Sequence, residues 1–260
     1  MRRLWVRWAL LVVFVVALAV LFVNLGEWQL RRLSERETRN ATTISNEQAP
    51  VQPYEQVFTR VIVDADQWQR VTATGTFDGA HQFVVRNRNN GENRGYEVVT
   101  PLRTATGTVL VDRGFLGVVP GTGIPAAGPP PPSGEVTVVG HVRRNEQGRS
   151  GAIKPVNGSV RLINSDALQP AIGHPVANGF ISAIEMTPPQ PGGFVPVAVP
   201  ELTSGPHFWY AMQWFMFAGI GILGIVVFIR SDLRDRRTAR DRAAGASEAS
   251  AERQRTPADT

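Results

Sequence analysis

Two long apolar stretches lie near the ends of the chain, and the sequence between them alternates on a much shorter scale. Residues 8–23 contain no polar or charged side chain, and residues 208–229 contain one tyrosine and one glutamine as their polar side chains. Each stretch approaches the roughly 20 residues that a helix needs to cross a ~30 Å hydrocarbon core. The pattern therefore predicts two transmembrane helices, over residues 8–25 and 207–229.

A cleaved signal peptide is the alternative interpretation of the first stretch, because Ala17, Leu18 and Ala19 resemble a small-residue cleavage site. The apolar run continues from Val20 to Val23, beyond the point where the polar cleavage region of a signal peptide begins. We therefore favour a membrane helix that is retained.

The sequence between the two helices has the pattern of β-strands. Six short runs rich in β-branched residues are separated by residues typical of turns: RVTATGTFD (70–78), QFVVRNR (82–88), GYEVVTPL (95–102), GTVLVDRGF (107–115), GEVTVVGHVRR (134–144) and GFISAIEM (179–186). Runs of this length predict an antiparallel barrel or sandwich rather than alternating β–α–β units. The expected fold class is a membrane protein with two transmembrane helices flanking a mainly β extracytoplasmic domain, residues 26–206.

Local signals predict the segments around the strands. Residues 24–40 are expected to continue the first helix outward as a juxtamembrane helix. The Asn-Gly pair at 90–91 is a turn signal that tolerates positive φ, and the Pro/Gly-rich residues 118–134 predict a loop without regular structure. A short helix is expected to begin with Ser165 as its N-cap and to stop by Pro170.

Charge placement orients the chain across the membrane. Residues 1–7 carry three arginines and no acidic residue, residues 26–206 carry 16 basic and 16 acidic residues, and residues 230–260 carry eight basic and six acidic residues. Because positive flanks stay in the cytoplasm, we predict a multi-pass protein with both termini cytoplasmic and the β domain outside.

The tail loses apolar periodicity from about Arg234 and is expected to be largely disordered. Lys154 is the one lysine among 27 basic residues, a bias typical of GC-rich bacterial genomes, so we expect a bacterial inner membrane.

Composition and motifs argue against several function classes. The net charge of +5 comes from the basic flanks of the two predicted helices. The sequence shows no basic face interleaved with aromatic residues, which argues against binding of single-stranded nucleic acid. The chain has no cysteine, so it lacks the thiolates that suit Cu(I) best, which argues against copper delivery. It contains no nucleophile elbow, zinc-helix motif, P-loop or calcium loop, so we expect that it is not an enzyme. The GIGILG run at 219–224 has dinucleotide-binding spacing, but it lies in an uncharged membrane helix, where small residues permit close helix contact.

Asp112 and Arg113 are adjacent at the end of an apolar strand. We expect them to form a partly buried ion pair or to shape a turn. An edge that contacts a partner is the alternative.

His207 lies where the second transmembrane helix enters the membrane on the outer side. On a helix, Tyr210 and Trp214 share its face, and the outer end of the first helix presents Trp28 and Arg32 at the same depth. Haem requires this combination of imidazole for the iron, flat apolar walls for the macrocycle and cations for the propionates. A polar anchor at the membrane interface is the alternative interpretation of the histidine.

Three blocks of the sequence resemble the Surfeit locus protein 1 family. LGEWQLRR (25–32) is similar to its L-G-x-W-Q-x-x-R opening, GYEVVTPL and GTVLVDRGF to its two central strands, and HFWYAMQWF (207–215) to its closing H-x-x-Y-A-x-x-W-F motif. The matches occur in the family's order, span most of residues 25–217 and have a membrane helix at each end. Members of this family are assembly factors of haem-a-type cytochrome c oxidase.

The resemblance implies an assembly factor that transiently binds haem a and presents it to subunit I of the oxidase. It makes His207 the candidate ligand of the haem iron, Tyr210 and Trp214 candidate walls of the pocket, and Trp28 and Arg32 candidate contacts from the other helix. The implied partners are subunit I and the lipid bilayer, with the respiratory supercomplex and haem a synthase as further candidates. The alternative is a non-haem scaffold or accessory subunit that stabilises the oxidase or the supercomplex.

Overall fold

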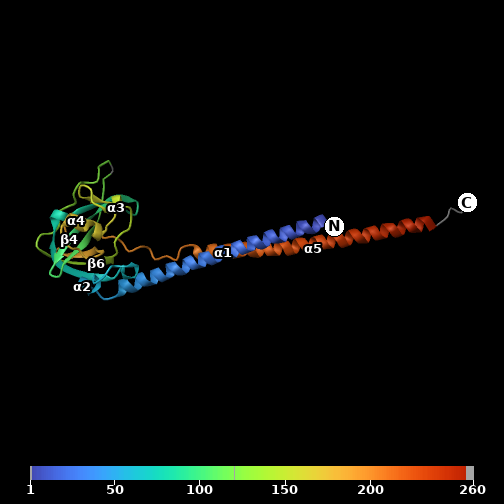
Figure 1. Ribbon diagram of the computed structural model, residues 1–260, viewed down its shortest axis with the longest axis horizontal. Helices are drawn as coiled ribbons and strands as arrows, with labels where there is room; N and C mark the ends of the chain where they lie inside the picture. Colours follow the sequence, from blue (N-terminus) through green and yellow to red (C-terminus); the bar gives the residue numbers. More distant parts are fainter. Residues whose placement is uncertain (1, 120, 256–260) are drawn as a thin grey trace. The chain divides into compact units, whose positions relative to one another are not determined.

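The computed structural model describes residues 2–119 and 121–255, which fall into two compact units (Figure 1). The first unit combines Met1–Glu37 with Thr203–Thr260, and the second is Thr38–Leu202. Helix α1, Arg2–Gln48, contributes to both units, whereas helix α5, His207–Arg255, belongs to the first. Both helices are long and apolar enough to cross a membrane by length and composition.

The first unit is an antiparallel helix pair. The ring of Trp8, early in α1, meets Phe228, well along α5, with 6.5 Å between ring centroids. Further along α1, Phe22 stacks on Trp214 near the start of α5, with 5.6 Å between centroids and 27° between ring planes. Figure 1 shows the two helices lying side by side over this length. The predicted pair of long apolar helices is confirmed.

The second helix extends beyond its apolar part. Where composition predicted a disordered tail, α5 continues to Arg255, and residues 256–260 lie outside the described residues. The segment is rich in alanine and arginine, which have high helix propensity. Arg236 also bonds Asp232 at i,i+4 with 2.7 Å between Nε and Oδ2.

The second unit is built around a closed five-stranded β-barrel. Its strands are β2 Arg70–Phe77, β4 Asn93–Thr104, β5 Thr108–Gly117, β6 Glu135–Arg143 and β8 Phe180–Thr187. They are ordered β2–β6–β8–β5–β4, and β4 pairs again with β2 to close the barrel. The closing pairs extend from Gly75↔Thr104 to Phe77↔Leu102. Gly75 is required there, because a Cβ would lie 2.1 Å from the carbonyl oxygen of Arg103.

Four of the five barrel pairings are antiparallel, as predicted, but β5 and β8 pair in parallel. A parallel pair needs a long crossover, and the chain between β5 and β8 passes through β6 and helix α4 before it returns. All six predicted strands are present. The one predicted strand that is not part of the barrel is β3 (Phe83–Asn90), which lies next to β4 in the sheet. It pairs with β4 in a hairpin whose turn contains Gly91 with φ 61°.

Short elements complete the unit. They are β1 Gln52–Pro53, β7 Ser159–Val160, α2 Tyr54–Val57, α3 Ser150–Ile153, α4 Ser165–Ile172 and the 3₁₀ turns η1 Asp64–Asp66 and η2 Gly79–His81. β1 runs parallel to β2, and β7 runs parallel to β3. The Pro/Gly-rich residues 118–134 form a loop without helix or strand in their described part, as predicted.

Strand β5 is buried on both faces. Val109 and Val111 point into a cluster within the barrel, whereas Leu110 joins a second cluster with Leu168 and Ile172 of α4. Since successive side chains alternate between faces, α4 must cover the outer face of this strand. This two-sided burial explains why Val109, Leu110 and Val111 are consecutive apolar residues.

Helix α4 differs from its prediction at both ends. The N-cap is Asn164 rather than Ser165, and its side chain accepts a backbone N–H of the first turn. The helix passes Pro170 and ends at Gly173, whose φ of 84° provides a left-handed C-cap. Leu168 is fully buried, so packing outweighs the one backbone hydrogen bond that the proline removes.

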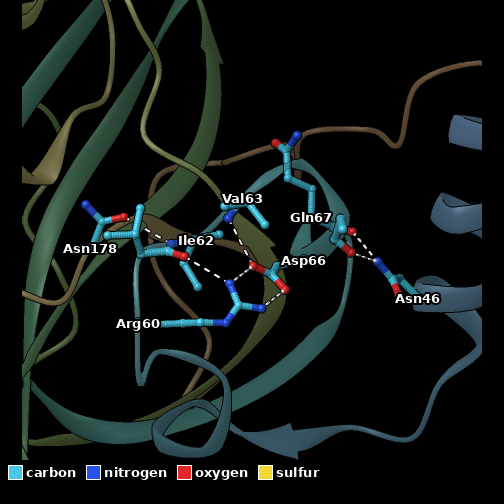
Figure 2. A network of polar contacts seen from close by, with 9 residues as sticks. Asn46, Arg60, Ile62, Val63, Asp66, Gln67 and Asn178 are labelled. Carbon is cyan, nitrogen blue, oxygen red and sulfur yellow. Dashed lines mark hydrogen bonds and ion pairs between the residues drawn. The ribbon is translucent and has the colours of Figure 1, made fainter.

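The end of α1 is tied to the loop before β2 (Figure 2). The amide nitrogen of Asn46 donates to the carbonyl oxygens of Ala65 and Gln67, each at 2.8 Å. The same loop is held by Arg60, which makes two 2.8 Å hydrogen bonds to the carboxylate of Asp66. This polar network fixes the last turns of α1 on the barrel unit.

Candidate functional site

The second long helix begins at the histidine that the sequence singled out. Gly205 adopts a left-handed φ of 68°, and Pro206 follows with a φ suited to a helix start and no N–H to leave unpaired. The carbonyl oxygen of Pro206 accepts the backbone N–H of Tyr210 at 3.2 Å. This turn places His207 at the first position of α5.

His207 is half-buried against α1. Its Nδ1 lies 2.7 Å from the side-chain oxygen Oε1 of Gln29. The hydrogen bond joins the two helices at the point where α5 begins. It also brings the opening block of the sequence resemblance into contact with the closing block, because Gln29 belongs to the first and His207 to the second.

The helices approach closely just beyond this hydrogen bond. Gly26, one turn before Gln29, faces Phe215, and a Cβ at position 26 would lie 2.6 Å from that ring. Ala211, one turn after His207, is fully buried. Small residues on both helices therefore set the helix separation at the histidine.

The five predicted site residues divide into two groups. His207 and Trp214 face α1, Trp214 through its stack on Phe22. Tyr210 is 48% exposed and Trp28 45% exposed. Arg32 lies over the Trp28 ring, with Cζ 5.8 Å from the centroid, and pairs with a neighbouring glutamate on α1 at 3.0 Å. The imidazole is thus held inside the helix pair, whereas Tyr210, Trp28 and Arg32 lie on its outer surface.

Further aromatic and cationic groups surround the start of α5. Phe208 and Trp209 follow the histidine, and Trp209 is 74% exposed. Arg36 of α1 reaches the preceding turn, where its Nη1 would lie 3.1 Å from a Cβ on Gly205. The start of α5 therefore combines one imidazole, exposed ring surfaces and a guanidinium.

The glycines of the GIGILG run contribute less to helix contact than predicted. A Cβ on Gly221 would meet Val15 at 3.7 Å, which is an ordinary contact. Gly219 and Gly224 have no heavy atom of the described residues within 4 Å of a Cβ. The close approach between α1 and α5 occurs instead at Gly26, so the predicted close contact is not made by these glycines between the two described helices.

The donor set fits a single-ligand haem site rather than a preformed metal centre. Within residues 2–119 and 121–255, no group of three His, Cys, Asp or Glu side chains could hold a metal ion. Haem iron is held by its macrocycle and needs one axial imidazole from the protein. His207 can provide this ligand through Nε2, and Trp28 and Tyr210 offer the exposed aromatic surface.

The expected pairing of Asp112 with Arg113 is wrong, because adjacent strand residues point to opposite faces. Asp112 is buried and accepts hydrogen bonds from the Gly114 N–H at 3.1 Å and the Ser182 hydroxyl at 3.2 Å. Arg113 points the other way and donates to the carbonyl oxygens of the loop at 129–130. Asp112 and Arg113 therefore make separate hydrogen bonds on opposite faces of β5.

A buried charged cluster lies around Asp112. Arg88 is shared by Glu97 and Glu146, each with a 2.7 Å contact. Burial and the charge of Asp112 together raise the pKa of Glu97 to about 8, and burial raises the pKa of Asp112 itself to about 6. Ion-pair networks that hold strands together also perturb pKa values, and this cluster connects β3, β4 and the segment after β6.

Sequence reasoning missed Gln29 and Gly26 as members of the site. Both lie in the LGEWQLRR block, but neither has the chemistry of a haem contact. Spacing offered a signal, since Gly26 and Gln29 are separated by three residues and so share a helix face. The sequence alone does not give the register between the two helices, which decides that Gln29 lies against His207.

Similarity to known proteins covers most of the chain. The sequence profile of the SURF1 family matches residues 16–219. This chain is also similar to uncharacterized SURF1-like proteins of Mycobacterium bovis and of two strains of Mycobacterium tuberculosis. Each relative is 30% identical to this chain over 237 residues, which cover 88% of this chain and 86% of the relative.

Proposed function

This chain belongs to the SURF1 family, whose members are generally oxidase assembly factors and are not known as enzymes, and from that premise we propose that it presents haem a to subunit I of cytochrome c oxidase. Some members of the family are linked to haem insertion. The observation that carries the proposal is the single imidazole of His207, held by α1 beside exposed aromatic rings at the start of a membrane-type helix.

Each site residue has a task in this proposal. When bound, haem a would supply an iron that an imidazole nitrogen of the protein can hold. His207 donates Nε2, and Tyr210 and Trp28 cover the macrocycle with their exposed rings. Trp214 forms the deeper wall against Phe22, and Arg32 binds a propionate through charge-assisted hydrogen bonds.

A carrier has to release what it binds. A single protein ligand from His207 would hold the haem less firmly than two protein ligands would, which would favour its release to an acceptor. Half-burial of His207 keeps the ligand close to the helix surface. Subunit I is the proposed acceptor, haem a synthase the proposed donor and the respiratory supercomplex a wider partner.

The proposed setting is the bacterial inner membrane. Both helices have the length and composition to span it, and the arginines of residues 1–7 and the basic residues after 229 favour a cytoplasmic location for both termini. The barrel unit then lies outside, with His207 at the outer surface of the bilayer.

The test is a reduced-minus-oxidised spectrum of the full-length protein purified from cells that make haem a. Wild type is expected to show a haem signal, and His207→Ala is expected to lose it while keeping its circular dichroism. His174→Ala is the matched control, because this histidine lies in the barrel unit after α4. An unchanged spectrum in His207→Ala would overturn the ligand assignment.

A non-haem scaffold is the second candidate. It is favoured by the aromatic and methionine side chains that α5 leaves exposed, among them Trp209, Met212 and Met216, which suit contact with another membrane helix. It predicts a colourless protein that co-purifies with intact oxidase in stoichiometric amounts. A haem spectrum that depends on His207 would exclude it as the sole function.

A further inference from the structure

The hydrogen bond between the helices selects the tautomer of the neutral His207 ring. Its Nδ1 lies 2.7 Å from Oε1 of Gln29, and an amide oxygen can accept a hydrogen bond but cannot donate one. Nδ1 therefore carries the proton of the neutral imidazole, and Nε2 keeps its lone pair. In metal sites, the partner of one ring nitrogen selects the other nitrogen as the ligand.

The partner of His207 is uncharged, unlike the partners of His81 and His141 in the barrel unit. His81 lies 2.9 Å from the carboxylate of Asp78, and His141 pairs with Glu47. A carboxylate partner raises the basicity of an imidazole ligand and so strengthens its bond to a metal. A neutral amide orients the ring with a smaller effect on basicity, which suits a ligand that has to exchange.

The helix contact around Gly26 keeps this hydrogen bond short. Gly26 precedes Gln29 by one turn and admits the ring of Phe215, which lies two turns after His207. The buried Ala211 lies between Phe215 and His207 on the same face of α5. Gln29 therefore reaches His207 from a helix that packs closely against α5 within one to two turns of the contact.

We propose that Gln29 is a positioning residue for haem binding, which holds His207 in the tautomer whose Nε2 binds the iron and keeps that bond exchangeable. This inference rests on the proposed function, because it assigns Gln29 a task at the same haem. The geometry assigns the task to the amide oxygen, so its removal and its replacement by a carboxylate have opposite effects.

The first experiment measures the tautomer without haem. Full-length protein labelled with ¹⁵N-histidine is placed in lipid nanodiscs, and the His207 ring signals are assigned by comparison with His207→Ala. Wild type is expected to show the Nδ1–H tautomer. Gln29→Leu keeps the volume and removes the acceptor, so it should shift the ring towards Nε2–H. Gln213→Leu, a change of the same kind on the exposed side of α5, should match wild type.

The second experiment measures haem a binding and its transfer to apomyoglobin. Loss of such a partner typically weakens metal binding about 10- to 100-fold, and this loss is expected for Gln29→Leu. Gln29→Glu is expected to restore the Nδ1–H tautomer, bind at least as tightly as wild type and release haem more slowly. A merely structural role for Gln29 would not produce slower release in the glutamate variant.

Separate results overturn the inference and the proposed function. An Nε2–H tautomer in wild type, or a Gln29→Leu variant with wild-type tautomer and haem affinity, overturns the role of Gln29 while His207 remains the ligand. A wild-type protein with the Nδ1–H tautomer that takes up no haem a overturns the proposed function and with it the ligand role, leaving the hydrogen bond as a contact between helices.

Discussion

Replacing Gly26 with alanine tests how the helix separation supports the site. A Cβ at position 26 would lie 2.6, 2.7 and 3.0 Å from three carbons of the Phe215 ring. Ordinary contacts begin near 3.4 Å, so the helices must separate by roughly 0.8 Å or the ring must leave its position. Overpacking of this kind costs about 1–3 kcal/mol. Separation also stretches the 2.7 Å hydrogen bond between Gln29 and His207 towards the ~3.5 Å at which it is lost.

The assay is unfolding of the full-length protein in mixed micelles by SDS titration, with the His207 tautomer recorded on the same sample. Gly26→Ala should unfold at lower SDS and lose part of the Nδ1–H signal. Gly219→Ala is the control, since no heavy atom of the described residues lies within 4 Å of its Cβ, and alanine favours helix over glycine by about 1 kcal/mol. Adding Phe215→Ala to Gly26→Ala removes the ring that the new Cβ would meet. The double variant should therefore recover part of the stability lost in Gly26→Ala, because the two substitutions act on one site. A Gly26→Ala variant that matches wild type in both measurements would refute the reasoning.

Two further predictions concern the barrel unit. The pKa of Glu97 is raised from 4.5 to about 8, so the folded state binds this proton more tightly than the unfolded state. Its contribution to stability is complete below pH 4.5 and is lost as the pH rises towards 8. Thermal unfolding of the full-length protein across this range should show the decline, and Glu97→Gln should flatten it; a wild-type profile that rises with pH would contradict the shift. Asn46→Ala removes two hydrogen bonds to the loop before β2 and is expected to cost about 1–2 kcal/mol. Hydrogen exchange should then accelerate at the amides of residues 63–68, and unchanged exchange there would show that the loop is held without α1.

The strands were predictable because each is marked locally. β2 and β6 alternate apolar and polar residues, and β5 begins with the apolar run Val109–Val111 after the turn residue Gly107. The parallel pairing of β5 with β8 was not predictable, since it depends on where the chain returns after α4. The continuation of α4 past Pro170 was missed for a similar reason, because burial of Leu168 by a distant strand decides it.

The residues of the candidate site could be singled out from their types and spacing, but their contacts could not. His207, Tyr210 and Trp214 follow from helical spacing near a membrane boundary, and the structure places His207 at the first position of α5. Gln29 could not be identified, because its partner is distant in sequence and the register of two apolar helices depends on packing. The partners of Asp112 were missed because sequence alone does not give tertiary contacts. Its hydrogen bonds to Gly114 and Ser182 replace the expected ion pair with Arg113.

Closure of the barrel limits how the barrel unit can bind other proteins. Because β2 pairs with both β6 and β4, the five barrel strands offer no open edge to an incoming strand. The sheet margins that remain are β1 and β7, each two residues long. The outer half of β3 is interrupted by an irregularity after Val85 and by the left-handed Asn87, features that blunt an edge. The closed barrel is thereby protected from edge-to-edge aggregation, and recognition of the barrel must proceed through its side chains and loops.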